Sequence, residues 1–189
     1  MTVQVEPARL DDKPIIQCLM QLYLYDYMEF EAGLELDRHG LFNYNYLDHY
    51  WVEAGRHPFL IRVDGTLAGF ALVRTLEPAS DEHRWYSMAE FFVMRRYRRR
   101  GVGQAAACQV FDRFRGRWEV GQDATNPGAT RFWRRVIGRY TDGHYEEERL
   151  DSPPPGHELE SGGVVQSFTA PGVPGVSVAT DRKEEHGEC

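Results

Sequence analysis

The residues of this chain with the clearest capacity for chemistry lie in one stretch, VMRRYRRRGVGQAA, at residues 93–106. Five arginines fall within residues 95–100, and Gly101 and Gly103 follow directly. If a helix begins at the glycines, its first turn offers free backbone N–H groups and the positive end of the helix dipole. Glycines let a ligand approach such amides closely, and guanidinium groups add charge-assisted hydrogen bonds. The pattern is typical of an anion site, with pyrophosphate as the natural occupant.

Other interpretations of this stretch compete with the anion site. It is not a Walker loop, which needs Gly-Lys followed by Ser or Thr, and it lacks the third glycine of the dinucleotide fingerprint. Glycines before a helix can also serve backbone geometry alone, and the residues by themselves leave that alternative open. Nucleic acid binding is disfavoured because the chain carries a net charge of −7, from 29 acidic and 22 basic residues. We therefore expect no nucleic acid partner.

Metal and membrane chemistry find little support in the sequence. Cys18, Cys108 and Cys189 are odd in number and lack metal-site spacing, and the histidines are isolated. No apolar run approaches the roughly 18 residues of a membrane span, and the N-terminus shows no secretory signal. We expect no metal, no membrane partner, and a cytoplasmic protein with reduced thiols.

The elements that must position the arginines and glycines follow from apolar periodicity. A central strand is predicted at 85–94, and a helix starts at the glycines and covers 101–114. Two strands flank Asp64-Gly65 within 58–76, an irregular or short-helical excursion is expected at 33–57, and the remaining elements are strands at 2–7, 117–121, 145–150 and 162–168 and helices at 11–31 and 126–140. This order predicts an α/β (α+β) fold in which a mixed sheet has helices on both faces.

Local signals support several of these boundaries. Asp64-Gly65 supplies the positive φ angles of a tight hairpin turn. Asn126 is a natural N-cap for the helix that follows it, and Asp11 or Asp12 can cap the first helix.

The chain is expected to form one domain at residues 1–169. Within it, SPPPG at 152–156 is expected to form a loop between the last two strands. From residue 170 the sequence loses its period and is rich in turn formers, which predicts a disordered tail at 170–189.

The motifs of the central region resemble those of a known enzyme family. The run from Arg98 to Ala105, RRRGVGQA, is similar to the acyl-CoA signature [Q/R]-x-x-G-x-[G/A] of the GNAT (Gcn5-related) acetyltransferases. An apolar strand, EFFV, precedes it, and NPGATRFW resembles that family's later N-x-x-A-x-x-F-[Y] segment. The likeness covers residues 59–150 well and extends to 1–169. It implies a mostly antiparallel twisted sheet whose strands splay at the acyl-CoA site.

The resemblance also implies an activity. It indicates an acetyl-CoA-dependent N-acetyltransferase that moves an acetyl group to a primary amine by direct attack on the thioester. The alternative is a non-catalytic acyl-CoA-binding or regulatory module of the same fold.

Cofactor-binding residues are carried over by motif. The backbone of Phe92, Val93 and Met94 is implied to pair with the pantetheine arm as an added strand. The backbone amides implied to hold the pyrophosphate belong to Arg98, Arg99, Arg100, Gly101, Val102, Gly103 and Gln104. Asn126 matches a family asparagine near the pantetheine, although helix capping alone also explains it.

The catalytic assignments are fewer. Glu90, a charged residue on an apolar strand, is the candidate general base, because burial of a carboxylate favours its basic function. Where many family members carry a tyrosine that protonates the departing thiolate, this chain has Trp133, which is implied to be a cofactor-binding residue that shapes the site through its ring. Its indole N–H is a poor acid, so either the thiolate leaves without help from a side chain or another residue serves. Tyr140 is the candidate replacement acid, with Tyr145 as an alternative.

The acceptor is expected to be an amine-bearing small molecule or peptide. Aromatic and acidic residues gather in the two segments that overhang the acceptor pocket in this family, and such residues suit a cationic amine. They are Tyr23, Tyr25, Asp26, Tyr27 and Glu29 in the first helix, and Tyr44, Tyr46, Asp48, Tyr50 and Trp51 in the excursion. Much of this aromatic content can equally be core, and a homodimer is left open.

Overall fold

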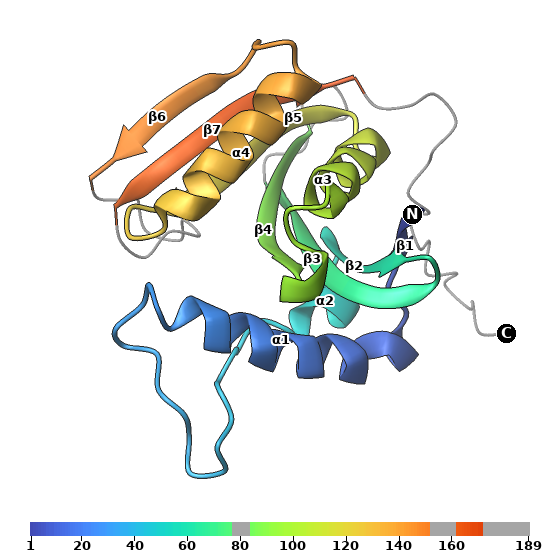
Figure 1. Ribbon diagram of the computed structural model, residues 1–189, viewed down its shortest axis with the longest axis vertical. Helices are drawn as coiled ribbons and strands as arrows, with labels where there is room; N and C mark the ends of the chain where they lie inside the picture. Colours follow the sequence, from blue (N-terminus) through green and yellow to red (C-terminus); the bar gives the residue numbers. More distant parts are fainter. Residues whose placement is uncertain (77–83, 152–161, 172–189) are drawn as a thin grey trace, which may run out of the picture.

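The computed structural model describes residues 1–76, 84–151 and 162–171. Its helices and strands follow the predicted order (Figure 1). They are β1 (Val3–Pro7), α1 (Lys13–Tyr27), α2 (His49–Val52), β2 (Arg56–Val63), β3 (Thr66–Leu76), β4 (Trp85–Val93), α3 (Val102–Arg113), β5 (Gly116–Asp123), α4 (Pro127–Tyr140), β6 (Glu146–Leu150) and β7 (Gly163–Ala170), with short 3₁₀ turns η1 (Leu10–Asp12) and η2 (Arg95–Tyr97). The predicted loop at 152–156 and nearly all of the predicted tail at 170–189 lie outside the described residues.

The strands of the described residues form one seven-stranded sheet in the order β1-β2-β3-β4-β5-β7-β6. Every neighbouring pair is antiparallel except β4 and β5, which are parallel. The predicted mixed, mostly antiparallel sheet with 85–94 at its centre is therefore confirmed.

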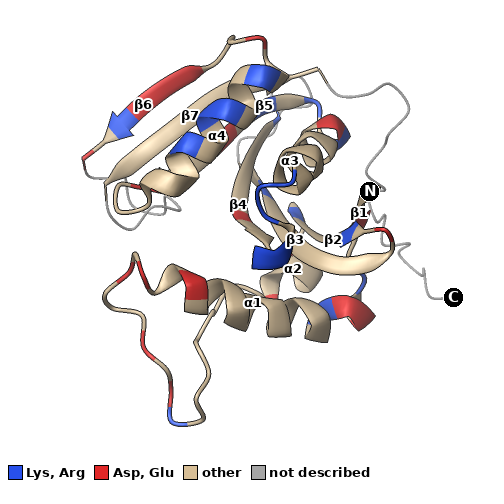
Figure 2. Ribbon diagram, in the orientation of Figure 1, with Lys and Arg blue, Asp and Glu red and all other residues tan. Residues whose placement is uncertain are grey.

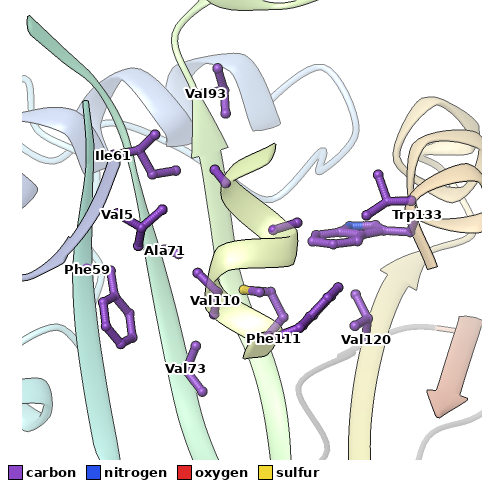
Figure 3. Packing of buried hydrophobic residues seen from close by; sticks show 14 of the residues in the cluster. Val5, Phe59, Ile61, Ala71, Val73, Val93, Val110, Phe111, Val120 and Trp133 are labelled. Carbon is purple, nitrogen blue, oxygen red and sulfur yellow. The ribbon is translucent and has the colours of Figure 1, made fainter. Parts of the chain in front are cut away.

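Helices cover both faces of this sheet, as expected (Figure 1). On one face, α1 buries Ile16, Met20 and Leu24 in a cluster with Leu72 and Phe92 of the sheet. On the other face, α3 contacts β1 and shares an apolar cluster with residues of β2, β3 and β4, and α4 lies against β5 and β7. Figure 3 shows the apolar contacts around α3, from Val5 of β1 to Trp133 of α4. Among the described helices, α4 is thus the one that covers the β5-β7-β6 part of the sheet, and it covers one face of that part.

The local signals had mixed outcomes. Asp64 and Gly65 have φ angles of 48° and 77°, so the predicted hairpin turn is confirmed. The Asn126 side chain accepts a hydrogen bond from the Ala129 N–H at 2.9 Å, which confirms it as the N-cap of α4. The expected capping of α1 by Asp11 or Asp12 is wrong. Turn η1 precedes the helix, and the Asp12 carboxylate accepts its hydrogen bond from the Arg9 N–H instead.

The segment between α1 and β2 is irregular apart from the one-turn helix α2, as predicted for 33–57. Phe42 and Leu47 anchor it, because both side chains are buried with those of α1. Gln21 of α1 adds two hydrogen bonds to the backbone of Phe42. In the described parts of the chain, no helix has both the length and the apolar character needed to cross a bilayer.

Candidate active site

The parallel strands β4 and β5 remain paired over only three residue pairs. These pairs join Trp85–Ser87 to Arg117–Glu119, after which β4 continues to Val93 and β5 to Asp123 without pairing to each other. The two strands therefore diverge toward their carboxyl ends (Figure 1). The splay expected at the centre of the sheet is present.

Both helices that follow these strands begin at the open end of the divergence. Helix α3 starts at Val102, shortly after β4, and α4 starts at Pro127, shortly after β5. The positive ends of two helix dipoles thus flank the same gap. Gly101, the N-cap residue of α3, has a φ of 81° and caps the helix with no side chain. A Cβ on Gly101 would meet no atom within 4 Å, so the space above the first turn of α3 is open.

Gly103 serves a different purpose from the one expected. A Cβ there would lie 3.1 Å from Cε2 of Phe132, so the glycine lets α4 pack closely against the start of α3. The amide nitrogen of Gly103 still belongs to the first turn of α3. Close helix packing, rather than ligand approach, accounts for the missing side chain.

Four of the five arginines of residues 95–100 divide into two groups, while the guanidinium of Arg96 lies over the Tyr97 ring. Arg95 and Arg98 form ion pairs with the two carboxylate oxygens of Asp26 at 2.6 and 2.5 Å. Asp26, which we expected on the acceptor side, instead ties the end of α1 to the segment after β4. Arg99 and Arg100 are exposed, and neither forms an ion pair with a carboxylate of the described residues. These two side chains remain able to approach an anion. Figure 2 shows the segment between β4 and α3 in the blue of Lys and Arg.

The backbone at the end of β4 is partly occupied by protein contacts. The N–H of Met94 donates to the Ala68 carbonyl at 2.9 Å, and its carbonyl accepts from the Tyr97 N–H at 2.9 Å. The Phe92 carbonyl points at Gly69 of β3, because a Cβ on that glycine would lie 2.0 Å from it. Alternation along the strand turns Val93 toward β5. Phe92 and Met94 are thus corrected as pairing residues, and Val93 is the one whose backbone faces the divergence. Its carbonyl accepts from Arg98 Nε at 2.6 Å, which leaves its N–H as the group to consider.

Glu90 lies on β4 beyond its last pair with β5, opposite Leu72 and next to an irregularity in the β3–β4 register. Its side chain is half-buried on the α1 side of the sheet. The Tyr44 hydroxyl donates to Glu90 Oε1 at 3.0 Å. The structure therefore brings the predicted base into contact with a residue of the predicted acceptor region.

Two further groups surround Glu90. The pKa of Tyr23 is raised well above its usual value, first by burial and then by the charge of Glu90 and a hydrogen bond to it. Tyr44 and Asp123 contribute smaller effects in the same direction. Asp123, the last residue of β5, was not predicted as a site residue. The signal that could have identified Asp123 is its position, because it is a charged residue at the end of β5, the strand that diverges from β4.

Trp133 belongs to the apolar core. It is 5% exposed, and its ring lies 5.2 Å from that of Phe91 and 6.2 Å from that of Phe111, centroid to centroid. Figure 3 shows the indole pointing from α4 toward Phe111 and Val120. The indole therefore contributes packing beneath the divergence.

Tyr140 does not lie at the divergence, and its assignment as the proton donor is corrected. Its hydroxyl donates to Asp112 at 2.9 Å, near the end of α3 opposite the first turn. Burial and this contact raise the pKa of the phenol, which makes it a poorer acid. The alternative, Tyr145, packs beside Gly138 at the end of α4.

A hollow of about 490 Å³ lies on the β5-β7-β6 part of the sheet. Glu119, Ser167 and Glu146 form one row across its three strands. The Arg117 guanidinium lies 4.4 Å from the centre of the Trp85 ring, so one cation–aromatic contact already exists there. The lining residues are Trp85, Arg117, Glu119, Glu146, Glu147, Glu148, Leu150, Val165 and Ser167. No group of three metal-binding side chains occurs among the described residues.

Comparison with known proteins identifies the fold and the family. The chain superposes on an acetyltransferase from Thermus thermophilus with a TM-score of 0.60 and 18% identity, covering 89% of this chain and 97% of that one. It also superposes on the ribosomal-protein-S18-alanine N-acetyltransferase from Escherichia coli (TM-score 0.54, 13% identity, 95% and 97% coverage). A third match is Arabidopsis thaliana NAA60 in complex with a bisubstrate analogue (TM-score 0.59, 14% identity, 89% and 98% coverage).

A model of the acetyltransferase (GNAT) family matches residues 20–138, which is more than half of the chain. The chain belongs to the GNAT acetyltransferase family. No curated protein matched it. GNAT proteins generally use acetyl-CoA, and the open first turn of α3, the two helix dipoles and the exposed Arg99 and Arg100 suit its phosphates. This GNAT protein thus keeps the family's diverging strands but has a buried tryptophan at 133.

Proposed function

We propose that this GNAT protein transfers an acetyl group from acetyl-CoA to a primary amine by direct attack of the amine on the thioester. The observation that carries the proposal is the position of Glu90. It lies on β4 just beyond the last β4–β5 pair, where the two strands separate below two helix N-termini. A thioester held between these strands would lie beside a carboxylate able to accept a proton.

The backbone amides of residues 99–104 hold the pyrophosphate in this proposal, with Arg99 and Arg100 beside them. The predicted contribution of the Arg98 amide is corrected, because its N–H donates to the Arg95 carbonyl at 3.2 Å. Val93 offers its N–H to the pantetheine arm. These contacts would fix the thioester relative to Glu90, and restricted orientation is itself a large part of catalysis.

The chemical step is a proton transfer followed by acyl transfer. A protonated amine gives one proton to Glu90, directly or through water, and becomes a nucleophile. A carbon–nitrogen bond forms at the thioester carbonyl, and the carbon–sulfur bond then breaks to release the thiolate of coenzyme A. The extra proton on the new amide nitrogen passes to that thiolate, which gives the neutral amide and the coenzyme A thiol, and Glu90 returns its own proton to solvent. Trp133 supplies no acid for that thiolate, since its indole is buried in the core.

A cationic acceptor is supported by the acidic residues near the divergence. Glu90 and Asp123 lie at the divergence, and Glu119, Glu146 and Glu148 line the hollow on the neighbouring strands. The E. coli structural neighbour is named for acetylation of an alanine of a ribosomal protein, which is consistent with an amine acceptor. We propose an amine-bearing small molecule or peptide and a cytoplasmic site of action.

The test measures thiol release from acetyl-CoA with a panel of polyamines, aminoglycosides, amino acids and peptides. Glu90→Gln should lower kcat on an accepted amine by about 100-fold or more near pH 7. Its affinity for acetyl-CoA, measured by calorimetry, should stay within about twofold of the wild type. Glu6→Gln on edge strand β1 is the matched control and should behave as wild type. Tight acetyl-CoA binding with no turnover on any amine would contradict the proposal.

A further inference from the structure

Glu90 receives its contacts from segments that are far apart in the sequence. Tyr44, from the segment between α1 and α2, donates to Oε1 of the carboxylate at 3.0 Å. Tyr23, from α1, packs edge-on against Phe92, with ring centroids 6.0 Å apart. Phe92 is two residues from Glu90 on the same strand, so both phenols lie on the side of β4 that Glu90 occupies.

The position of Tyr44 is fixed by its neighbours. Two residues earlier, the backbone of Phe42 is bonded to Gln21 of α1 through both its N–H and its carbonyl. The Phe42 side chain is buried against the same helix. The Tyr44 ring also packs edge-on against Tyr46, with centroids 6.1 Å apart. An otherwise irregular segment therefore delivers one phenol to a defined place.

We propose that Tyr44 is a positioning residue for acetyl transfer, which acts by holding the Glu90 carboxylate in the orientation that accepts the proton of the amine. This inference rests on the proposed function, because the contact has a kinetic effect only if Glu90 is the base. A carboxylate has about four lone-pair sites, and the phenol at Oε1 occupies one of them.

The titratable groups around Glu90 bear on the expected pH dependence. Tyr44 from the irregular segment donates to Glu90, and Tyr23 from α1 interacts both with Glu90 and with Asp123 at the end of β5. Asp26 of α1 is paired with Arg95 and Arg98. A phenol that donates to a carboxylate stabilises its charged form. Loss of the Tyr44 hydroxyl should therefore require a higher pH to keep Glu90 ionised, and it also frees the side chain to turn.

Tyr44→Phe tests this inference in the full chain, with Tyr86→Phe as the matched control. Tyr86 lies on the same strand as Glu90, at the end where β4 still pairs with β5, and its ring packs on those of Phe114 and Trp118. We expect Tyr44→Phe to lower kcat about tenfold, with KM for acetyl-CoA unchanged. The acidic limb of its kcat/KM profile should move up by about one pH unit. Tyr86→Phe should match the wild type in all three measurements.

A double variant separates positioning through Glu90 from a general structural effect. If Tyr44 acts through Glu90, Tyr44→Phe should change kcat less than about twofold when Glu90 is already Gln. A second, activity-independent readout is the midpoint of Glu90 titration by carbon-13 NMR, which should move upward in Tyr44→Phe alone.

The outcomes distinguish the two proposals. If Tyr44→Phe and Tyr86→Phe give the same kcat, profile and NMR midpoint while Glu90→Gln abolishes turnover, the inference is wrong and the proposed function stands. An equal loss of kcat from Tyr44→Phe in both backgrounds also overturns it. Failure of the wild type to acetylate any amine overturns both.

Discussion

Gln21 bonds both backbone groups of Phe42 with a single side chain. Its Nε2 donates to the Phe42 carbonyl at 3.0 Å, and its Oε1 accepts from the Phe42 N–H at 2.8 Å. A helix residue thereby does for the irregular segment what a neighbouring strand would do. Because Tyr44 follows two residues later, this pair of hydrogen bonds connects the stability of the segment to the geometry at Glu90.

Gln21→Glu is expected to weaken that connection. The carboxylate can still accept from the Phe42 N–H, but it cannot donate to the carbonyl and places a charge beside it. We expect the free energy of unfolding to fall by about 1–3 kcal/mol, measured by urea titration. Gln17→Glu, an exposed change on the same helix, is the control and should alter stability by less than about 0.5 kcal/mol. Equal effects of the two changes would contradict the role of Gln21.

Substitutions at Gly101 and Gly40 can separate the cost of backbone strain from an effect on coenzyme A binding. Gly101 and Gly40 have φ angles of 81° and 75°, and a Cβ on either would meet no atom within 4 Å. Gly101→Ala and Gly40→Ala should therefore each cost about 1–2 kcal/mol of stability. Only the change at 101 should weaken coenzyme A binding, and Gly101→Glu should weaken it by about tenfold or more, since it adds a negative charge beside the phosphates. Calorimetry showing unchanged affinity in Gly101→Glu would refute the phosphate assignment.

His57 makes stability depend on pH. Burial lowers the pKa of its imidazole from 6.5 to about 4, beside Thr75 Oγ1 at 3.1 Å and the Phe114 ring. Below pH 6.5 the imidazole of His57 binds a proton in the unfolded chain but stays neutral in the folded chain. The free energy of unfolding should therefore fall as the pH decreases from 6.5 to about 4. The contribution is up to roughly 3 kcal/mol. His57→Gln should give a shallower slope in thermal melts over this range; an identical slope would contradict the assignment.

Local patterns were sufficient to predict the elements of the fold. Asp64-Gly65 encodes its own turn, and Asn126 caps α4 because the capping bond reaches only three residues along the chain. The capping of α1 was mispredicted because Asp12 bonds backward to Arg9 instead.

The site was less accessible to sequence reasoning. Glu90 could be singled out as a charge on an apolar strand, but its partner Tyr44 is 46 residues away, and no periodicity relates the two. Tyr140 was misassigned for the same reason. Its hydroxyl is bonded to Asp112, 28 residues earlier, and only the packing of α4 against α3 brings them together. Such contacts depend on tertiary packing, which no local pattern specifies.

The two ion pairs of Asp26 with Arg95 and Arg98 connect α1 to the segment before α3. Helix α1 lies on the proposed acceptor side, and the segment before α3 leads into the glycine turn. If a ligand at the glycine turn strengthens these ion pairs and thereby the affinity for a ligand under α1, the second ligand must raise the affinity for the first by the same factor. In the proposed reaction, the ion pairs of Asp26 would then couple the binding of the two co-substrates.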